Sequence, residues 1–134
     1  MSQANVNLVR GLYDAFAAGD VPAVLGRMSQ DIIWNEAENF PYADGNPYVG
    51  PEAVLNGVFA RCVAEWDGFG VEIEEFLDAG ETVVALGRYV GTYRETGRPQ
   101  RTQVVHVWRI ADGKVIGFQQ YADTLGIAKV MGRT

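Results

Sequence analysis

The hydrophobic pattern of this chain changes its period about halfway along, and that change restricts the folds it can adopt. In the first half, one apolar helix face is indicated by residues that recur every three or four positions, namely Val6, Val9, Leu12, Tyr13 and Phe16. In the second half, short turns separate four runs rich in β-branched and aromatic residues, over 71–78, 82–93, 103–110 and 115–122. Because short turns join antiparallel neighbours, we expect an α+β domain with an antiparallel meander.

Shorter elements complete the first half of the chain. Asp20 is expected to cap a second helix from Pro22 to about Met28, and a strand should follow over 31–36. Pro51 opens a third helix, whose buried stripe is predicted at four-residue spacing: Val54, Val58, Cys62 and Trp66. A final short helix is predicted over about 123–132.

Composition and length limit the classes of protein that need consideration. The chain has 134 residues without an internal repeat or a linker, so we expect one domain over 1–134. With 11 Lys and Arg against 17 Asp and Glu, the net charge of −6 argues against a nucleic-acid partner. No run approaches the ~20 apolar residues of a membrane span. The polar amino end and the lone Cys62, expected to be a buried and inert thiol, favour a cytoplasmic protein.

Several segments carry a family resemblance, and they occur in the family's order over nearly the whole chain. They read LYDAFAAGD, DIIWNE, YVGPEAV, TVVALGRYVGTYRETGRP, VVHVWRIADGKV and FQQYADT. In these segments the chain resembles the SnoaL-like, ketosteroid-isomerase-like branch of the nuclear-transport-factor-two-like superfamily. The resemblance implies a cone-shaped, strongly bent sheet wrapped around a long N-terminal helix and an apolar pocket. Relatives include isomerases, cyclases, hydrolases, dehydratases and binders without activity, so the fold alone leaves the function open.

Strand alternation points to two residues that could carry chemistry. Glu36 shares a strand face with Trp34, and His106 shares one with Trp108. If these faces line the pocket, apolar surroundings should raise the pKa of Glu36 into the range of a general base. Two alternatives stay open: Glu36 could be a carboxylate exposed at a strand end, and His106 could be a hydrogen-bonded core residue.

The resemblance also implies roles for these residues. Glu36 falls where ketosteroid isomerases carry the proton-abstracting carboxylate, and His106 falls on the protonated aspartic acid of their oxyanion hole. Their hydrogen-bonding tyrosine corresponds to Leu12, while Tyr13 points about 100° away around the helix, which counts against steroid isomerisation. In SnoaL-like cyclases the acid–base pair would correspond to His106 and Asp123. Asp123 can equally be read as the N-cap of the last helix.

The remaining predictions concern the ligand and possible cofactors. Aromatic side chains are expected to line the pocket, although core packing predicts the same residues: Trp34, Trp108, Phe118 and Tyr13. Arg88 is a further candidate that reaches either solvent or a carboxylate in the cavity. Since His106 is the only histidine, a zinc site built on several imidazoles is not expected. The sequence indicates no other cofactor either.

These observations predict a cofactor-free isomerase or cyclase that enolises a small apolar or aromatic carbonyl compound. Two alternatives stay open, a binding module for an apolar ligand and a hydrolase or dehydratase assisted by a carboxylate. Outward apolar residues such as Val105 and Val107, together with the resemblance, also lead us to expect a homodimer formed through the sheet.

Overall fold

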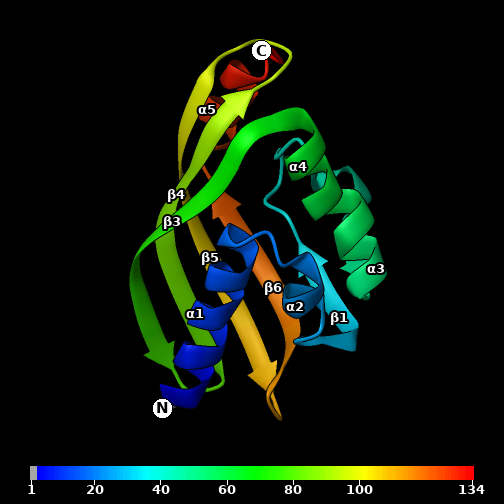
Figure 1. Ribbon diagram of the computed structural model, residues 1–134, viewed down its shortest axis with the longest axis vertical. Coiled ribbons are helices and arrows are strands. Elements are labelled where there is room, and N and C mark those ends of the chain that lie inside the picture. Colours follow the sequence, from blue (N-terminus) through cyan, green and yellow to red (C-terminus); the bar gives the residue numbers. More distant parts are fainter. Residues whose placement is uncertain (1–2) are drawn as a thin grey trace.

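The computed structural model describes residues 3–134, so Met1 and Ser2 of the predicted domain lie outside the described residues. Short helical elements fill much of the first half, and long strands fill the second (Figure 1). The order is α1 (Gln3–Ala17), α2 (Val21–Leu25), β1 (Met28–Asn35), η1 (Ala43–Gly45), β2 (Tyr48–Val49), α3 (Pro51–Val54), η2 (Leu55–Phe59), α4 (Ala60–Glu65), β3 (Trp66–Ala79), β4 (Thr82–Tyr93), β5 (Pro99–Ala111), β6 (Lys114–Ala122) and α5 (Thr124–Val130).

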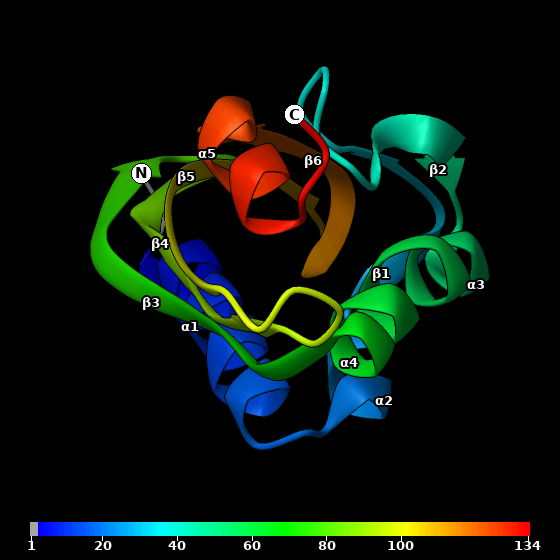
Figure 2. The same ribbon diagram turned by 90° about the horizontal axis from the view of Figure 1, so that it is seen from above.

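The strands form one curved sheet in the order β2-β1-β6-β5-β4-β3. From β3 to β6 each strand pairs antiparallel with the next, which confirms the predicted meander. Among the described strands, only the neighbours β1 and β6 run parallel. The sheet curls around α1, and α5 lies over one end of the curl (Figure 2). The α+β fold with a strongly bent sheet is therefore confirmed.

β3 and β4 approach each other closely where their register shifts. The register of this pair shifts between Ile73 and Glu75, next to the point where Gly87 faces Ile73. A Cβ at Gly87 would collide with the carbonyl oxygen of Glu72, so a residue without a side chain is needed there. Such irregularities increase the local twist of a sheet.

Two boundaries in the first half differ from the prediction. The second helix ends at Leu25, and Met28 begins β1, where it pairs with Val115 of β6. Arg27 N–H bonds to Val24 O, only three residues back, at 3.2 Å, so the α-helical pattern stops there. The next residue, Met28, pairs with β6 and belongs to the sheet. Trp66 is buried as predicted, but its backbone is extended and it starts β3.

One continuous helical run is formed by α3, η2 and α4, and its middle part is π-helical. The predicted buried residues Val54, Val58 and Cys62 are buried, and the wider π turn buries Phe59 beside them. A Cβ on Gly57 would collide with the ring of Tyr48. The π segment therefore needs a glycine at the point where it packs against β2.

The outer face of the sheet presents several apolar side chains. Val105 and Val107 are partly buried there, and Ile116 and Tyr121 are exposed. Pairing of two copies through this face remains a prediction. Within residues 3–134, no helix combines the length and the apolar character needed to cross a membrane.

Candidate functional site

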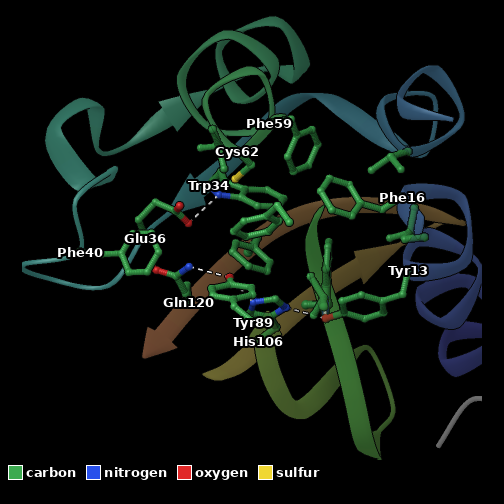
Figure 3. Close-up of a pocket in the computed structure, with 17 residues that line it drawn as sticks. Tyr13, Phe16, Trp34, Glu36, Phe40, Phe59, Cys62, Tyr89, His106 and Gln120 are labelled. Carbon is green, nitrogen blue, oxygen red and sulfur yellow. Dashed lines mark hydrogen bonds between the residues drawn. The ribbon is translucent and has the colours of Figure 1, made fainter. Parts of the chain in front are cut away.

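A cavity of about 50 Å³ lies between α1, the helical run of α3 to α4 and the concave face of the sheet (Figure 3). Most of its walls are apolar or aromatic, and only a few polar side chains enter it. The lining residues are Leu12, Tyr13, Phe16, Val24, Trp34, Glu36, Phe40, Val58, Phe59, Cys62, Phe69, Val71, Tyr89, His106, Trp108, Phe118 and Gln120.

Three of the predicted pocket residues form a continuous aromatic wall. The rings of Trp34 and Phe118 are stacked with centroids 3.7 Å apart, and the Trp108 ring meets Phe118 edge-on at 4.7 Å. Cross-strand register explains this, because β1, β6 and β5 place Trp34, Phe118 and Trp108 side by side. Their contact with a ligand remains a prediction.

Glu36 lines the cavity immediately after the end of β1 and is only 3% exposed. Its carboxylate oxygen Oε2 accepts a hydrogen bond of 3.1 Å from Trp34 Nε1. Asn46 holds the backbone of Glu36 from both sides, since its Oδ1 accepts from Glu36 N (2.9 Å) and its Nδ2 donates to Glu36 O (2.8 Å). The side chain is thus directed inward, not into solvent.

The surroundings of Glu36 favour its protonated form. Burial raises the pKa of this carboxyl to about 8, although the Trp34 hydrogen bond and the positive charge of Arg61 act in the opposite direction. At neutral pH a minority of the molecules therefore carry a carboxylate in the cavity. A carboxyl with a pKa close to the working pH can both accept and return a proton.

His106 lies between two tyrosine hydroxyls (Figure 3). The Tyr13 hydroxyl is 2.6 Å from Nδ1, and the Tyr89 hydroxyl is 2.6 Å from Nε2. Burial lowers the pKa of His106 to about 3, so the ring is neutral. Burial also raises the pKa of both tyrosine hydroxyls, which keeps them protonated.

Two further side chains close the ends of this hydrogen-bonded row. Trp108 Nε1 donates to the Tyr13 hydroxyl at 2.9 Å. Gln120 Nε2 donates to the Tyr89 hydroxyl at 2.7 Å, while its Oε1 accepts from Ala37 N at 3.0 Å. The row therefore runs Trp108, Tyr13, His106, Tyr89, Gln120, and it leaves neither ring nitrogen of His106 free.

The structure does not bring the other predicted site residues to His106. Asp123 is exposed and caps α5, where its Oδ1 accepts from Gly126 N at 3.0 Å. It lies beyond the end of β6, so the alternation that directs Gln120 inward no longer applies to it. Arg88 follows the alternation of β4 to the face opposite Tyr89 and donates to Arg101 O. Neither residue lines the cavity.

Three functional candidates were not singled out from the sequence. Tyr89 and Gln120 occupy inward positions of β4 and β6. A polar residue at an inward strand position is the sequence feature that could have identified them. Asn46 gave no signal, because its loop is placed beside Glu36 only by the fold. Tyr13 and Leu12 both line the cavity. The angle of about 100° between their directions on α1 therefore does not exclude Tyr13 from the site.

Glu36 also borders an outer groove of about 620 Å³ lined mainly by polar residues. The groove lies between the end of β1, the loop at Asn46 and the end of β6, where Gln119 and Tyr121 face outward. Among the residues named for the two hollows, only Glu36 is shared. Glu36 therefore lies between the apolar cavity and the outer groove.

Over the described part of the chain, no three or more His, Cys, Asp or Glu side chains are grouped so that they could hold a metal ion. Cys62 borders the cavity as a free thiol, and burial raises its pKa. A raised pKa disfavours the thiolate, so this residue does not have the character of a nucleophile.

Comparison with known proteins places the chain in a family. An NTF2-like protein from Burkholderia thailandensis is 37% identical, with 98% of each chain covered and a TM-score of 0.90. An NTF2-like protein of unknown function from Burkholderia pseudomallei is 29% identical, covering 97% of this chain and 98% of its own, with a TM-score of 0.86.

TerC, crystallised with polyporic acid, is 23% identical over 97% of this chain and 99% of its own, and its TM-score of 0.86 shows a shared fold. No curated protein matches the sequence. The model of the SnoaL-like domain matches residues 9–118, and the chain therefore belongs to the SnoaL-like domain family.

Proposed function

We propose that this protein is a cofactor-free enzyme that enolises a small carbonyl compound, as an isomerase or a cyclase does. The observation that carries the proposal is the buried carboxyl of Glu36, whose pKa is raised to about 8 and which borders the same apolar cavity as the row around His106. Removal of a proton next to a carbonyl needs a base and a donor for the developing oxyanion. Glu36 supplies the first, and the tyrosine–histidine row supplies the second.

The size of the cavity supports a small substrate. A volume of about 50 Å³ is below the ~150 Å³ of an engineered cavity that binds benzene. A ligand of a few non-hydrogen atoms fits without rearrangement, whereas a polycyclic one requires the aromatic side chains to move.

The test is deuterium exchange into small ketones dissolved in D₂O, from acetone to cyclohexanone, followed by NMR. Glu36 acts as a base only when ionised, so the exchange rate should rise with pH and level off above a pH of about 8. Glu36→Gln should lower it by about 10²–10⁴, the range for a general acid–base group. Glu38→Gln, which removes an exposed carboxyl nearby, should leave the rate unchanged.

Exchange that Glu36→Gln leaves unaltered would contradict the role of Glu36. If the wild-type protein exchanges none of these ketones faster than buffer does, the enolisation proposal fails for small carbonyl compounds.

A binding module without activity is the second candidate. The aromatic lining supports it, and so does the ligand in the structure of TerC, which has the same fold. Saturable binding of a small apolar compound, with no conversion and no change of affinity in Glu36→Gln, would favour this reading over the enzyme.

A further inference from the structure

The hydrogen-bonded row around His106 has donors at both of its ends. Trp108 Nε1 has no acceptor capacity, so it must donate to the Tyr13 oxygen. At the other end, Ala37 N–H donates to Gln120 Oε1, which fixes the orientation of the amide. The amide nitrogen of Gln120 therefore donates to the Tyr89 oxygen.

Between these ends, the number of hydrogens exceeds the number of hydrogen bonds. Tyr13, Tyr89 and neutral His106 contribute two hydroxyl hydrogens and one ring N–H, but the row contains only two contacts between a hydroxyl and the ring. If Nδ1 carries the ring hydrogen, it donates to Tyr13, and the Tyr13 hydroxyl hydrogen is unused. If Nε2 carries it, the unused hydrogen belongs to Tyr89.

In both tautomers one hydroxyl hydrogen thus lacks an acceptor. Within residues 3–134, the hydroxyls of Tyr13 and Tyr89 have only the partners already named. A buried donor without an acceptor is unfavourable, and both residues line the cavity. An oxygen atom placed in the cavity would therefore find a donor that the protein itself does not use.

We propose that this hydroxyl hydrogen anchors the carbonyl oxygen of the ligand, and that His106 is a positioning residue whose tautomer selects Tyr13 or Tyr89 as the donor. This differs from the sequence-based expectation that His106 itself donates to the ligand. The carbonyl class of the ligand rests on the proposed function, but the anchoring does not depend on Glu36 acting as the base.

The test is the infrared C=O stretch of a small ketone bound to the wild-type protein, isolated by subtracting the spectrum of the ¹³C-carbonyl form. It is recorded at a pH of about 9.5, where Glu36 is ionised and can only accept, while both tyrosines keep their hydrogens. We expect a saturable band below its frequency in hexane. A bound band at the hexane frequency, or no saturable binding by ketones from acetone to cyclohexanone, would overturn the proposal.

Variants identify the donor. Tyr13→Phe or Tyr89→Phe should move the band toward the hexane frequency, according to which hydroxyl is used, and the double variant should do so in either case. Tyr42→Phe is the control, since its hydroxyl donates to Glu65 at 2.6 Å and the residue does not line the cavity. A band that stays in place in the double variant would refute a tyrosine donor.

The infrared and exchange experiments fail independently of each other. A shifted band without deuterium exchange would support the anchor and contradict Glu36 as a base. Deuterium exchange with an unshifted band would support Glu36 as a base and contradict the anchor.

Discussion

Replacing Glu36 by Gln should change the way in which the stability of the fold depends on pH. In the folded protein the carboxyl keeps its proton up to a pH of about 8, whereas the pKa of an unperturbed glutamate is 4.5. Between these values, unfolding releases a proton, so a rise in pH favours the unfolded chain. The stability associated with the buried, protonated carboxyl is fully present below 4.5 and is lost as the pH rises through about 8.

The size of the effect follows from the difference between the two pKa values. Each pKa unit corresponds to about 1.4 kcal/mol, so the full loss is about 5 kcal/mol, and about 2–3 kcal/mol of it falls between pH 5 and 7. A glutamine has no such titration but can still accept from Trp34 Nε1. The free energy of unfolding of Glu36→Gln should therefore rise relative to that of the wild type as the pH increases.

Urea denaturation followed by tryptophan fluorescence would measure these free energies from about pH 5 to about pH 8. The quantity to compare is how the difference in the free energy of unfolding between wild type and Glu36→Gln changes with pH. The substitution also has an effect on stability that is independent of pH, and this comparison removes it. Glu38→Gln serves as the control for the loss of one carboxyl. A difference between wild type and Glu36→Gln that stays constant with pH, or that changes in the opposite direction, would refute a buried Glu36 with a raised pKa.

Three further predictions follow from the same geometry. The ring NMR signals of His106 should not titrate between pH 9 and about 5, because its pKa is lowered to about 3; a midpoint near 6.5 would show a solvated ring. Phe118→Ala should lower the free energy of unfolding by about 3–5 kcal/mol and enlarge the cavity, and a loss under about 1 kcal/mol in urea would contradict the packing described. Gly57→Ala should cost about 1–3 kcal/mol by forcing the Tyr48 ring away from the π segment, whereas an unchanged thermal midpoint would show that the ring moves freely.

Local pattern was sufficient to predict most of the architecture. The run of β-branched and aromatic residues between two turns predicted the bounds of β4 without error. The apolar spacing on α1 predicted its buried face at Val6, Val9 and Leu12. These signals are readable because each element buries one face, and the period of that face is a property of the backbone. Predictions of element boundaries were wrong where strand pairing sets the boundary. Met28, for example, joins β1 because it pairs with Val115 of β6.

The candidate site was only partly accessible from the sequence. The inward positions of Trp34, Glu36, His106 and Trp108 follow from strand alternation and are found in the cavity. Asp123 was assigned two roles by the sequence, and the structure shows the capping one, because the sheet ends before it.

The sequence by itself determined which residues share a face of the sheet, because side-chain alternation needs no knowledge of the neighbouring strands. Only the tertiary structure decided how those residues combine. Tyr13 on α1 and Tyr89 on β4 meet the two nitrogens of His106 across separations of 93 and 17 residues. The burial that raises the pKa of Glu36 and lowers that of His106 arises from side chains of many elements, so no local segment of the chain contains it.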